Sequence, residues 1–327
     1  MPEQSSHHLH SLYGLVLSAN YPLAGVPSAP SGSTVDVHVA FERVADPEAL
    51  RRDTLPLEQS PNTAAGTPLF VLHRRGDGYL FDFPDATQFV ISGDGTDIRV
   101  SWQPPVDAEV AAVYLVNTVM AFVLRLRGHE VLHASAIVVD GYSIAIVGPS
   151  GAGKSTLAAC LAQRGFAVLS EDVAALVEAG DRYFVLPSHS RIRLWSDSAA
   201  LVSRKELRFL AGADWKRYLD AGPPPLRPFE LAAIYSLDDR QASPLAPRVE
   251  PLNERDGLVD LIANSYHNIR DPRFAPASFE RLGRLARSVP LRLAVPHSDL
   301  ASALRLGDLI VEDVRALLAA RTAPVAS

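Results

Sequence analysis

The stretch of sequence that decides the fold is Gly148-Pro149-Ser150-Gly151-Ala152-Gly153-Lys154-Ser155. An apolar segment, Ile144–Val147, precedes it, and Thr156–Ala159 follows it with the composition of a helix start. The stretch satisfies the pattern G-x-x-x-x-G-K-[ST] at every fixed position. Its glycines let the backbone curl so that several N–H groups point at one anion, and the amino end of a helix adds partial positive charge. The sequence therefore predicts a phosphate-binding loop between a strand and a helix.

We expect the residues from Gly148 to Thr156 to bind ATP, with Lys154 neutralising phosphate oxygens and the Ser155 hydroxyl holding Mg²⁺. The loop indicates nucleotide binding without naming one reaction, because transporter ATPases and small nucleotide kinases carry it too. A transporter ATPase needs an LSGGQ-like helix start, which the sequence lacks. Small nucleotide kinases usually begin with the loop, whereas nearly 150 residues precede it here.

Two adjacent acids, Glu171 and Asp172, follow Ser170 at the end of the next expected strand, Ala167–Leu169. In an open α/β sheet, the carboxyl ends of the strands form the rim where ligands bind. One carboxylate there can hold Mg²⁺, and another can take the proton of an attacking hydroxyl. The bland alternative is a polar loop start. His133 lies near the loop only if the strand that follows it neighbours the loop strand.

These elements resemble, in order and spacing, the catalytic domain of HPr kinase/phosphorylase. His133-Ala134-Ser135 begins fifteen residues before Gly148, and Glu171 lies seventeen residues after Lys154, as the corresponding residues do in that family. The likeness covers roughly residues 128 to 200. It implies an ATP-dependent serine kinase that uses ATP and Mg²⁺, with an α/β P-loop fold like that of phosphoenolpyruvate carboxykinase.

The sequence also departs from that family. The first acid there is Asp and acts as the base, whereas here it is Glu171, one methylene longer, so the base and metal roles can be exchanged. The favoured assignment is Glu171 as base supported by His133, with Ser155 and Asp172 holding Mg²⁺. The signature of enzymes that recognise the phosphocarrier protein is missing. With that signature missing and Tyr13-Gly14-Leu15 near its start, the sequence resembles the kinases that phosphorylate the carboxyl-terminal serine of lasso-peptide precursors.

Basic residues after the acidic pair are candidates for substrate binding. Arg191 and Arg193 alternate on an expected strand and so point the same way. Their guanidinium groups can bind the transferring phosphoryl group or a substrate carboxylate in a bidentate manner. The alternative is a solvated strand face. Lys216 and Arg217 could add charge, although a surface position is favoured for both.

The chain divides by texture into two expected domains. Residues 1–106 hold short apolar segments separated by Pro, Gly and Asp, which predict a small, mostly antiparallel β domain. Residues 107–327 would form the P-loop kinase domain, beginning with a helix over 107–127 that Gly128 ends. Further helices are expected over 156–163, 197–210, 257–265, 277–287 and 298–320.

Composition excludes several classes of protein. The 327 residues are 47% hydrophobic and 21% charged, so we do not expect a disordered chain. The net charge is −6, so we do not expect the broad positive surface that binds nucleic acid or anionic lipid. The single cysteine, Cys160, cannot form an internal disulfide. The apolar run Val110–Leu124 is shorter than the roughly 20 residues that span a bilayer, so we expect a buried helix and a cytoplasmic protein.

The sequence thus favours a kinase that phosphorylates a serine hydroxyl of a peptide or protein partner, with no nucleic-acid or membrane partner. Two alternatives stay open: a small-molecule kinase, and a nucleotide-gated binding module that hydrolyses ATP slowly. The acceptor, the oligomeric state and a reverse phosphorylase activity stay undetermined at this level, and a homo-oligomer is compatible with it.

Overall fold

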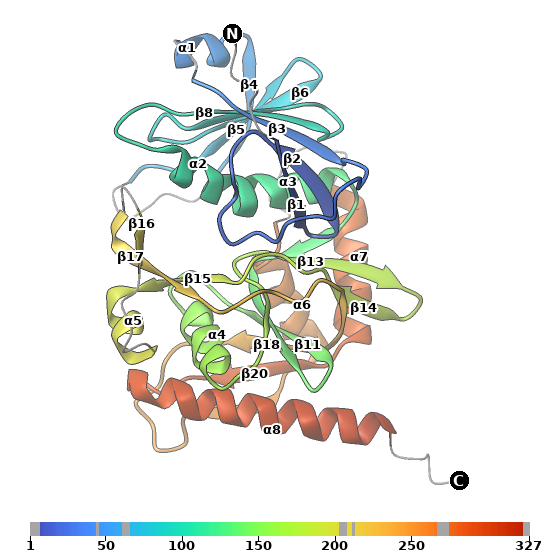
Figure 1. The fold of residues 1–327 in the computed structure, drawn as a ribbon. Coiled ribbons are helices and arrows are strands. Elements are labelled where there is room, and N and C mark those ends of the chain that lie inside the picture. Colours follow the sequence, from blue (N-terminus) through green and yellow to red (C-terminus); the bar gives the residue numbers. More distant parts are fainter. Residues whose placement is uncertain are drawn as a thin grey trace. The chain divides into compact units, whose positions relative to one another are not determined.

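The structure is a computed structural model that describes residues 7–43, 46–60, 66–202, 208–210, 213–266 and 275–322 (Figure 1). These residues form two compact units. Unit 1 contains the described residues of Met1–His129 and of two short later segments, Leu210–Asp214 and Tyr266–Pro276. Unit 2 contains those of Glu130–Phe209, Trp215–Ser265 and Ala277–Ser327.

Unit 1 is built on an eight-stranded sheet with the order β1-β2-β3-β8-β7-β6-β5-β4. Its strands are β1 (His8–Leu12), β2 (Leu15–Ala19), β3 (Val37–Phe41), β4 (Thr54–Gln59), β5 (Val71–Arg75), β6 (Gly78–Asp82), β7 (Gln88–Ile91) and β8 (Asp97–Ser101), with a short helix α1 (Pro47–Arg51) before β4. Neighbouring strands pair antiparallel except for β2 with β3 and β3 with β8. These strands form a mostly antiparallel sheet, in line with the β-rich character expected of this part of the sequence.

One interrupted helix packs on this sheet. Asp107 caps α2 (Ala108–Tyr114), which continues through a π-helical turn, Leu115–Val119, into α3 (Met120–Leu126). The ring of Phe122 lies 4.7 Å from that of Tyr79 and 5.3 Å from that of Phe81, both on β6, in edge-on contacts. The Tyr13 hydroxyl donates to the carbonyl oxygen of Val116 at 3.0 Å. Buried aromatic side chains contribute a large part of the stabilising free energy of a small hydrophobic core.

This helix was expected to begin the kinase domain, and its contacts group it with unit 1 instead. The reason is that its apolar residues are buried against the sheet of unit 1, so the chain changes units at about His129 and not at residue 106. By length and composition alone the segment Ala108–Leu126 could cross a membrane, but 72% of it is buried within the structure. That burial is what a core helix shows, as expected for Val110–Leu124.

Unit 2 is built on a nine-stranded mixed sheet. Its strands are β9 (Glu130–Leu132), β10 (Ala134–Val139), β11 (Tyr142–Val147), β12 (Val168–Ser170), β13 (Ala174–Ala179), β14 (Arg182–Val185), β18 (Phe229–Leu237), β19 (Arg248–Pro251) and β20 (Leu291–Val295). The main order is β12-β10-β11-β18-β14-β13-β9, and β20 pairs with β18 and β19. Strands β11, β18 and β20 run parallel, and β10 runs antiparallel to both β11 and β12. A further small sheet, β15-β17-β16, consists of β15 (Arg191–Trp195), β17 (Ala213–Asp220) and β16 (Arg208–Leu210).

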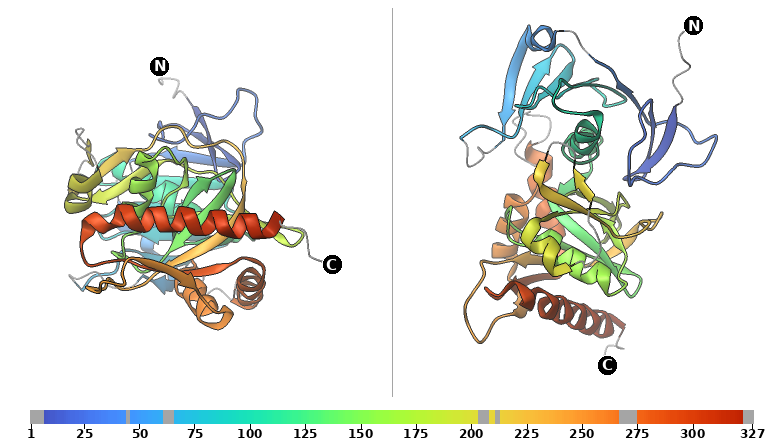
Figure 2. Two further views of the ribbon diagram at one scale, coloured as in Figure 1. Left: turned by 90° about the horizontal axis from the view of Figure 1, so that it is seen from below. Right: turned by 60° about the vertical axis from the view of Figure 1, so that its left-hand side comes forward.

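Helices cover both faces of the large sheet of unit 2. Side chains of α4 (Lys154–Gln163), α5 (Ser196–Val202) and α8 (Ala303–Thr322) form one core with Ile144 and Ile146 of β11. Side chains of α6 (Glu254–Ala263) and α7 (Ala275–Ser288) form a second core with the alternate residues Ala145 and Val147. The left view of Figure 2 shows α8 lying along one face of the strands. An apolar strand without polar alternation, such as β11, is what a sheet covered on both faces requires.

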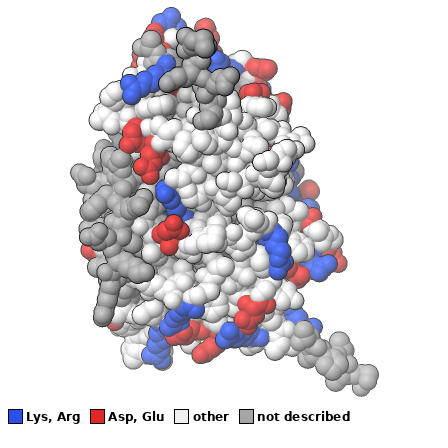
Figure 3. Space-filling view, viewed as in Figure 1, with Lys and Arg blue, Asp and Glu red and all other residues white. Residues whose placement is uncertain are grey.

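Charged side chains in unit 2 join helices to the rest of the fold at its surface. Arg315 of α8 pairs with Asp140 in the β10–β11 turn, Arg164 pairs with Asp308, and Arg284 of α7 pairs with Glu178 of β13. Exposed pairs of this kind each contribute little to stability. Figure 3 shows basic and acidic side chains interspersed on the described part of one face, without a broad basic field there.

Several elements differ from the expectations. The helix expected over 197–210 ends at Val202, residues 203–207 lie outside the described part of the chain, and Arg208–Leu210 is strand β16. The helix expected over 298–320 is a short 3-10 turn, Leu300–Ser302, followed by α8. Strands β1, β4, β9, β14, β17, β19 and β20 were not expected. They are short or carry polar residues, so local pattern alone does not mark them.

The turn between β5 and β6 offers a matched test of the sheet of unit 1. A Cβ on Gly78 would lie 2.3 Å from the carbonyl oxygen of Ile91 on β7, whereas one on Gly76, at φ +60°, would meet no atom within 4 Å. We expect Gly76→Ala to cost about 1 kcal/mol of unfolding free energy through its left-handed backbone. Gly78→Ala should cost about 3 kcal/mol because two backbones must separate. Urea unfolding monitored by tryptophan fluorescence measures both, and equal midpoints would contradict this packing.

Candidate active site

The loop Gly148–Ser155 joins β11 to α4, in the strand–loop–helix order that the sequence predicts. Gly148 has φ +146°, and a Cβ there would meet Leu237 of the adjacent strand β18 at 3.1 Å. Gly153, at φ +115°, occupies the amino-terminal cap of α4 and offers no side chain to cap its N–H groups. The first N–H groups of α4 are thereby directed at the loop, as anion binding at a helix amino end requires.

Lys154 lies inside this loop. Its side chain is buried, and its Nζ donates to the carbonyl oxygens of Gly148 at 2.6 Å and Pro149 at 3.1 Å. Burial lowers the pKa of the Lys154 amine to about 8, and the negative charge of Glu171 partly opposes that shift. A cation held this way among backbone oxygens is positioned to exchange them for phosphate oxygens.

Glu171 contacts the loop directly. It follows β12, it is fully buried, and its Oε1 accepts a hydrogen bond from the Ser155 hydroxyl at 2.7 Å. The expectation from sequence paired Ser155 with Asp172, and in the structure Glu171 takes that place. The hydroxyl and the buried carboxylate are two oxygen donors of the kind Mg²⁺ prefers, beside backbone N–H groups suited to phosphate. These residues fit a magnesium–nucleotide and would hold its metal ion through the Ser155 hydroxyl and the Glu171 carboxylate.

Asp172 is held differently from Glu171. It lies at the centre of a tight three-residue turn in which the N–H of Val173 donates to the carbonyl oxygen of Glu171 at 2.8 Å, and its φ is +64°. Its carboxylate forms an ion pair with Arg193 of β15. A non-glycine residue in this left-handed conformation costs of order 1–3 kcal/mol, and such residues cluster at functional sites.

His133 lies at the same edge of the sheet. The strand that follows it, β10, pairs with the loop strand β11, and Ala134 lies opposite Val147. His133 is therefore near the loop, which the sequence predicts only if these two strands are neighbours. Its Nδ1–H donates to the carbonyl oxygen of Asp172 at 2.9 Å. A neutral imidazole in this arrangement has its lone pair on Nε2. His133 is therefore beside the backbone of Asp172 and positions that turn.

Asn264, at the carboxyl end of α6, is a site residue that sequence reasoning missed. Its Oδ1 accepts from the N–H of Gly148 at 3.1 Å, and its carbonyl oxygen accepts from the N–H of His133 at 2.6 Å. It therefore joins the first residue of the loop to the histidine. An asparagine that ends a helix is ordinary in sequence, so no local signal marks this contact.

The remaining candidates are divided by the structure. Arg191 and Arg193 share one face of β15, as expected, but Arg191 lies over the ring of Tyr218, 5.5 Å from its centre, while Arg193 contacts Asp172. The Thr156 hydroxyl donates to Ser198 of α5 at 2.8 Å. The side chains of Lys216 and Arg217 lie outside the described part of the structure. Among the described residues, no group of three or more His, Cys, Asp or Glu side chains is arranged to hold a metal ion.

Comparison with known proteins adds little beyond these residues. No protein-family model matches the sequence, and no curated protein matches it. Among solved structures, the chain is similar to the Hpr(Ser) kinase/phosphatase from Coxiella burnetii, with 16% identity and a TM-score of 0.33. That match covers 59% of this chain and 94% of the other. We therefore base the function on the site residues themselves.

The lowered pKa of Lys154 makes nucleotide affinity depend on pH. The ordinary pKa of lysine is 10.5, and burial brings that of Lys154 to about 8, so the free protein loses this charge as the pH rises through about 8. We expect the affinity for ATP at saturating Mg²⁺ to fall above pH 8, by at most about tenfold per pH unit. Calorimetric titration between pH 7 and 9.5 measures this. The Lys154→Arg variant stays charged throughout, and a fall of the same steepness in that variant would assign the pH dependence to another group.

Proposed function

We propose that the chain is an ATP-dependent kinase that transfers the γ-phosphoryl group to the hydroxyl of a serine in a peptide or protein. The observation that carries this proposal is the contact between Ser155 and Glu171 at the mouth of a complete phosphate loop, with the more accessible Asp172 next in sequence. A nucleotide-hydrolysing module needs one carboxylate to organise metal and water. A second carboxylate at the same rim suits the activation of an acceptor hydroxyl.

The two acids differ in exposure, and this decides their proposed roles. Glu171 is fully buried and accepts a hydrogen bond from the Ser155 hydroxyl, so its proposed role is to hold Mg²⁺ together with Ser155. The Asp172 side chain is 17% exposed, so an incoming hydroxyl can reach it. We therefore assign the base to Asp172 and the metal side to Glu171 with Ser155, which exchanges the assignment favoured from sequence. His133 positions Asp172 through its backbone carbonyl oxygen.

The chemistry follows from this arrangement. The acceptor oxygen forms a bond to the γ-phosphorus while the bond to the β–γ bridging oxygen breaks, and ADP leaves with that electron pair. The hydroxyl proton passes to the carboxylate of Asp172. Lys154 and the loop N–H groups stabilise charge on the phosphate oxygens, and Arg193 is near enough to Asp172 to contact the transferring group. Ser155 and Glu171 would hold Mg²⁺, which would supply further positive charge to the phosphates.

Paired variants of the two acids test this assignment. We expect Asp172→Asn to lower kcat by about 10²- to 10⁴-fold, with the affinity for Mg-ATP unchanged within about threefold, because it removes the proton acceptor and leaves Ser155, Glu171 and the loop in place. Glu171→Gln should raise the Mg²⁺ concentration needed for half-maximal activity. Steady-state kinetics with Mg²⁺ and ATP varied separately distinguish the two effects. The opposite pattern would restore Glu171 as the base, and two fully active variants would remove both acids from the mechanism.

For the acceptor, we propose a serine at the carboxyl end of a ribosomal-peptide precursor, following the resemblance of the sequence to lasso-peptide kinases. Two features support a peptide. The sheet of unit 1 ends in the outer strands β1 and β4, and Leu55 on β4 is 69% exposed, so an extended peptide can add to an edge. Arg191 and Arg193 share a face of β15 and suit a terminal carboxylate. Homo-oligomerisation and a cytoplasmic location remain predictions from sequence.

Mass spectrometry after incubation with Mg-ATP tests the acceptor. A candidate precursor with a terminal serine should gain one phosphoryl group, its terminal Ser→Ala form should gain none, and its amidated form should react at least about tenfold more slowly because a charge-assisted contact is lost. Lys154→Ala is the control for the loop and should abolish every gain. Equal gain by the amidated peptide would remove the carboxylate from recognition. Turnover of a small alcohol with no gain on any peptide would favour the small-molecule kinase.

A further inference from the structure

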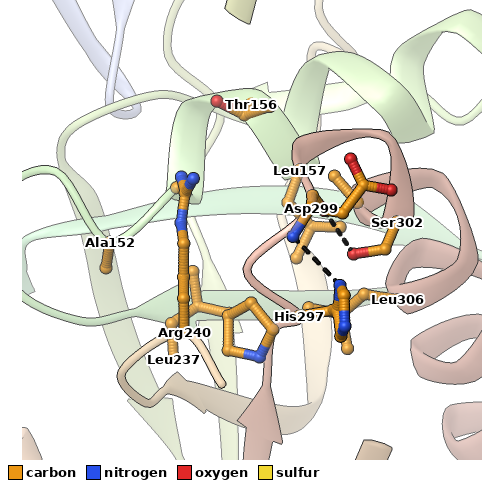
Figure 4. A pocket seen from close by; sticks show the side chains of 12 residues that line it. Ala152, Thr156, Leu157, Leu237, Arg240, His297, Asp299, Ser302 and Leu306 are labelled. Atoms are coloured by element: carbon orange, nitrogen blue, oxygen red, sulfur yellow. Dashed lines mark hydrogen bonds between the residues drawn. The ribbon is translucent and has the colours of Figure 1, made fainter. Parts of the chain in front are cut away.

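A pocket in unit 2 lies beside the phosphate loop on the side away from Glu171 and Asp172. It has a volume of about 340 Å³, its open mouth included. Its lining comes from the loop and α4, from the end of β18, and from the segment between β20 and α8; the lining residues are Ala152, Gly153, Thr156, Leu157, Leu237, Arg240, Pro296, His297, Asp299, Ser302, Ala303 and Leu306 (Figure 4).

Sheet order determines this location. Strands β11, β18 and β20 are parallel neighbours, so their carboxyl ends meet at one edge, where ligands of open α/β sheets bind. The acids follow β12, which lies on the other side of β11 with β10 between them. The loop after β11 therefore stands between an acidic side and the pocket. If a triphosphate on the loop directs its terminal phosphate to the acids, the other end of the molecule lies on the pocket side of the loop.

The walls of the pocket suit a flat heteroaromatic group. Leu157, Leu237 and Leu306 supply apolar surface from three different elements. Figure 4 shows the Arg240 side chain extending along one wall toward the loop, where its Nη2 lies 3.6 Å from the position that a Cβ on Gly153 would take. A guanidinium can stack on a planar ring and also offset phosphate charge, so this position serves the junction between a base and its phosphates.

The opposite wall offers polar groups whose orientation is fixed. The N–H of Asp299 donates to Nδ1 of His297 at 3.0 Å, so a neutral His297 carries its proton on Nε2. The Ser302 hydroxyl donates to the carbonyl oxygen of Asp299 at 2.6 Å (Figure 4). The N–H of Ala301 donates to Oδ1 of Asp299 at 3.1 Å. These bonds hold one donor and one carboxylate beside an apolar cavity, the combination by which proteins recognise polar heterocycles and sugars.

We infer that this pocket binds the nucleoside of the nucleoside triphosphate, with the base against the leucines and Arg240 and the polar edge of the nucleoside at His297 and Asp299. The inference rests on the proposed function for the triphosphate and adds the orientation of the molecule across the loop. Binding energy from this remote part of the substrate would help to position the γ-phosphoryl group at the acids.

A matched pair of substitutions tests the pocket. Ala303 lines it, whereas Ala301, two residues earlier, does not and is exposed. We expect Ala303→Phe, which fills the cavity, to raise the Kd of ATP at least about tenfold and to leave that of inorganic tripolyphosphate unchanged within about twofold, since only ATP carries a nucleoside. Ala301→Phe should alter neither value. Equal effects of Ala303→Phe on both ligands, or no effect on either, would overturn the inference.

A second measurement uses the unmodified chain and does not depend on the folding of a variant. Photolysis with 8-azido-ATP should label peptides from residues 237–240 or 296–306, and excess ATP should prevent that labelling. Labels confined to other segments would overturn the inference. Failure of the kinase proposal is a separate result: Ala303→Phe would still discriminate between ATP and tripolyphosphate and the label would still appear, yet the wild-type protein would phosphorylate no acceptor. If the pocket inference alone fails, phosphoryl transfer persists without the discrimination by Ala303→Phe.

Discussion

Strand β10 forms backbone hydrogen bonds with β11 on one side and with β12 on the other, and the chemistry of unit 2 depends on this ladder. Because β10 is antiparallel to both neighbours, β11 and β12 run in the same direction and end at the same edge. The loop Gly148–Ser155 follows β11 at that edge, and Glu171 follows β12. The amino end of β10 lies at that edge too, which places His133 between them.

The opposite charges at this edge are buried together. Lys154 is buried in the loop, and Glu171 is fully buried beside it. Burial lowers the pKa of Lys154, and the negative charge of Glu171 partly offsets that shift. Removing a charge from water is costly unless a partner and hydrogen bonds compensate. Here Ser155 bonds to Glu171 and loop carbonyl oxygens accept from Lys154. Such a site is held in place before a substrate arrives, which reduces the reorganisation needed during phosphoryl transfer.

The two sides of the loop differ in chemistry as well as in position. The side toward β12 carries two carboxylates, a histidine and Arg193. The side toward β18 and β20 is an apolar pocket with few polar groups. A single substrate that is flat and apolar at one end and highly charged at the other matches both sides at once, which a symmetrical ligand could not do.

The sequence by itself determined the phosphate loop, its strand and helix, the β-rich character of the first hundred residues and the buried helix after Pro104-Pro105. These features are local, because glycine spacing and apolar periodicity act within one element. The tertiary structure alone decided which acid meets Ser155. Glu171 and Asp172 are adjacent, and the pairing of β12 with β10 includes an irregularity at Ala136 and Ile137, so a shift of one residue would exchange them. Likewise Asn264 reaches the loop, and Arg240 and His297 reach the pocket beside it, from distant segments through strand order, which depends on long-range pairing that no local pattern encodes.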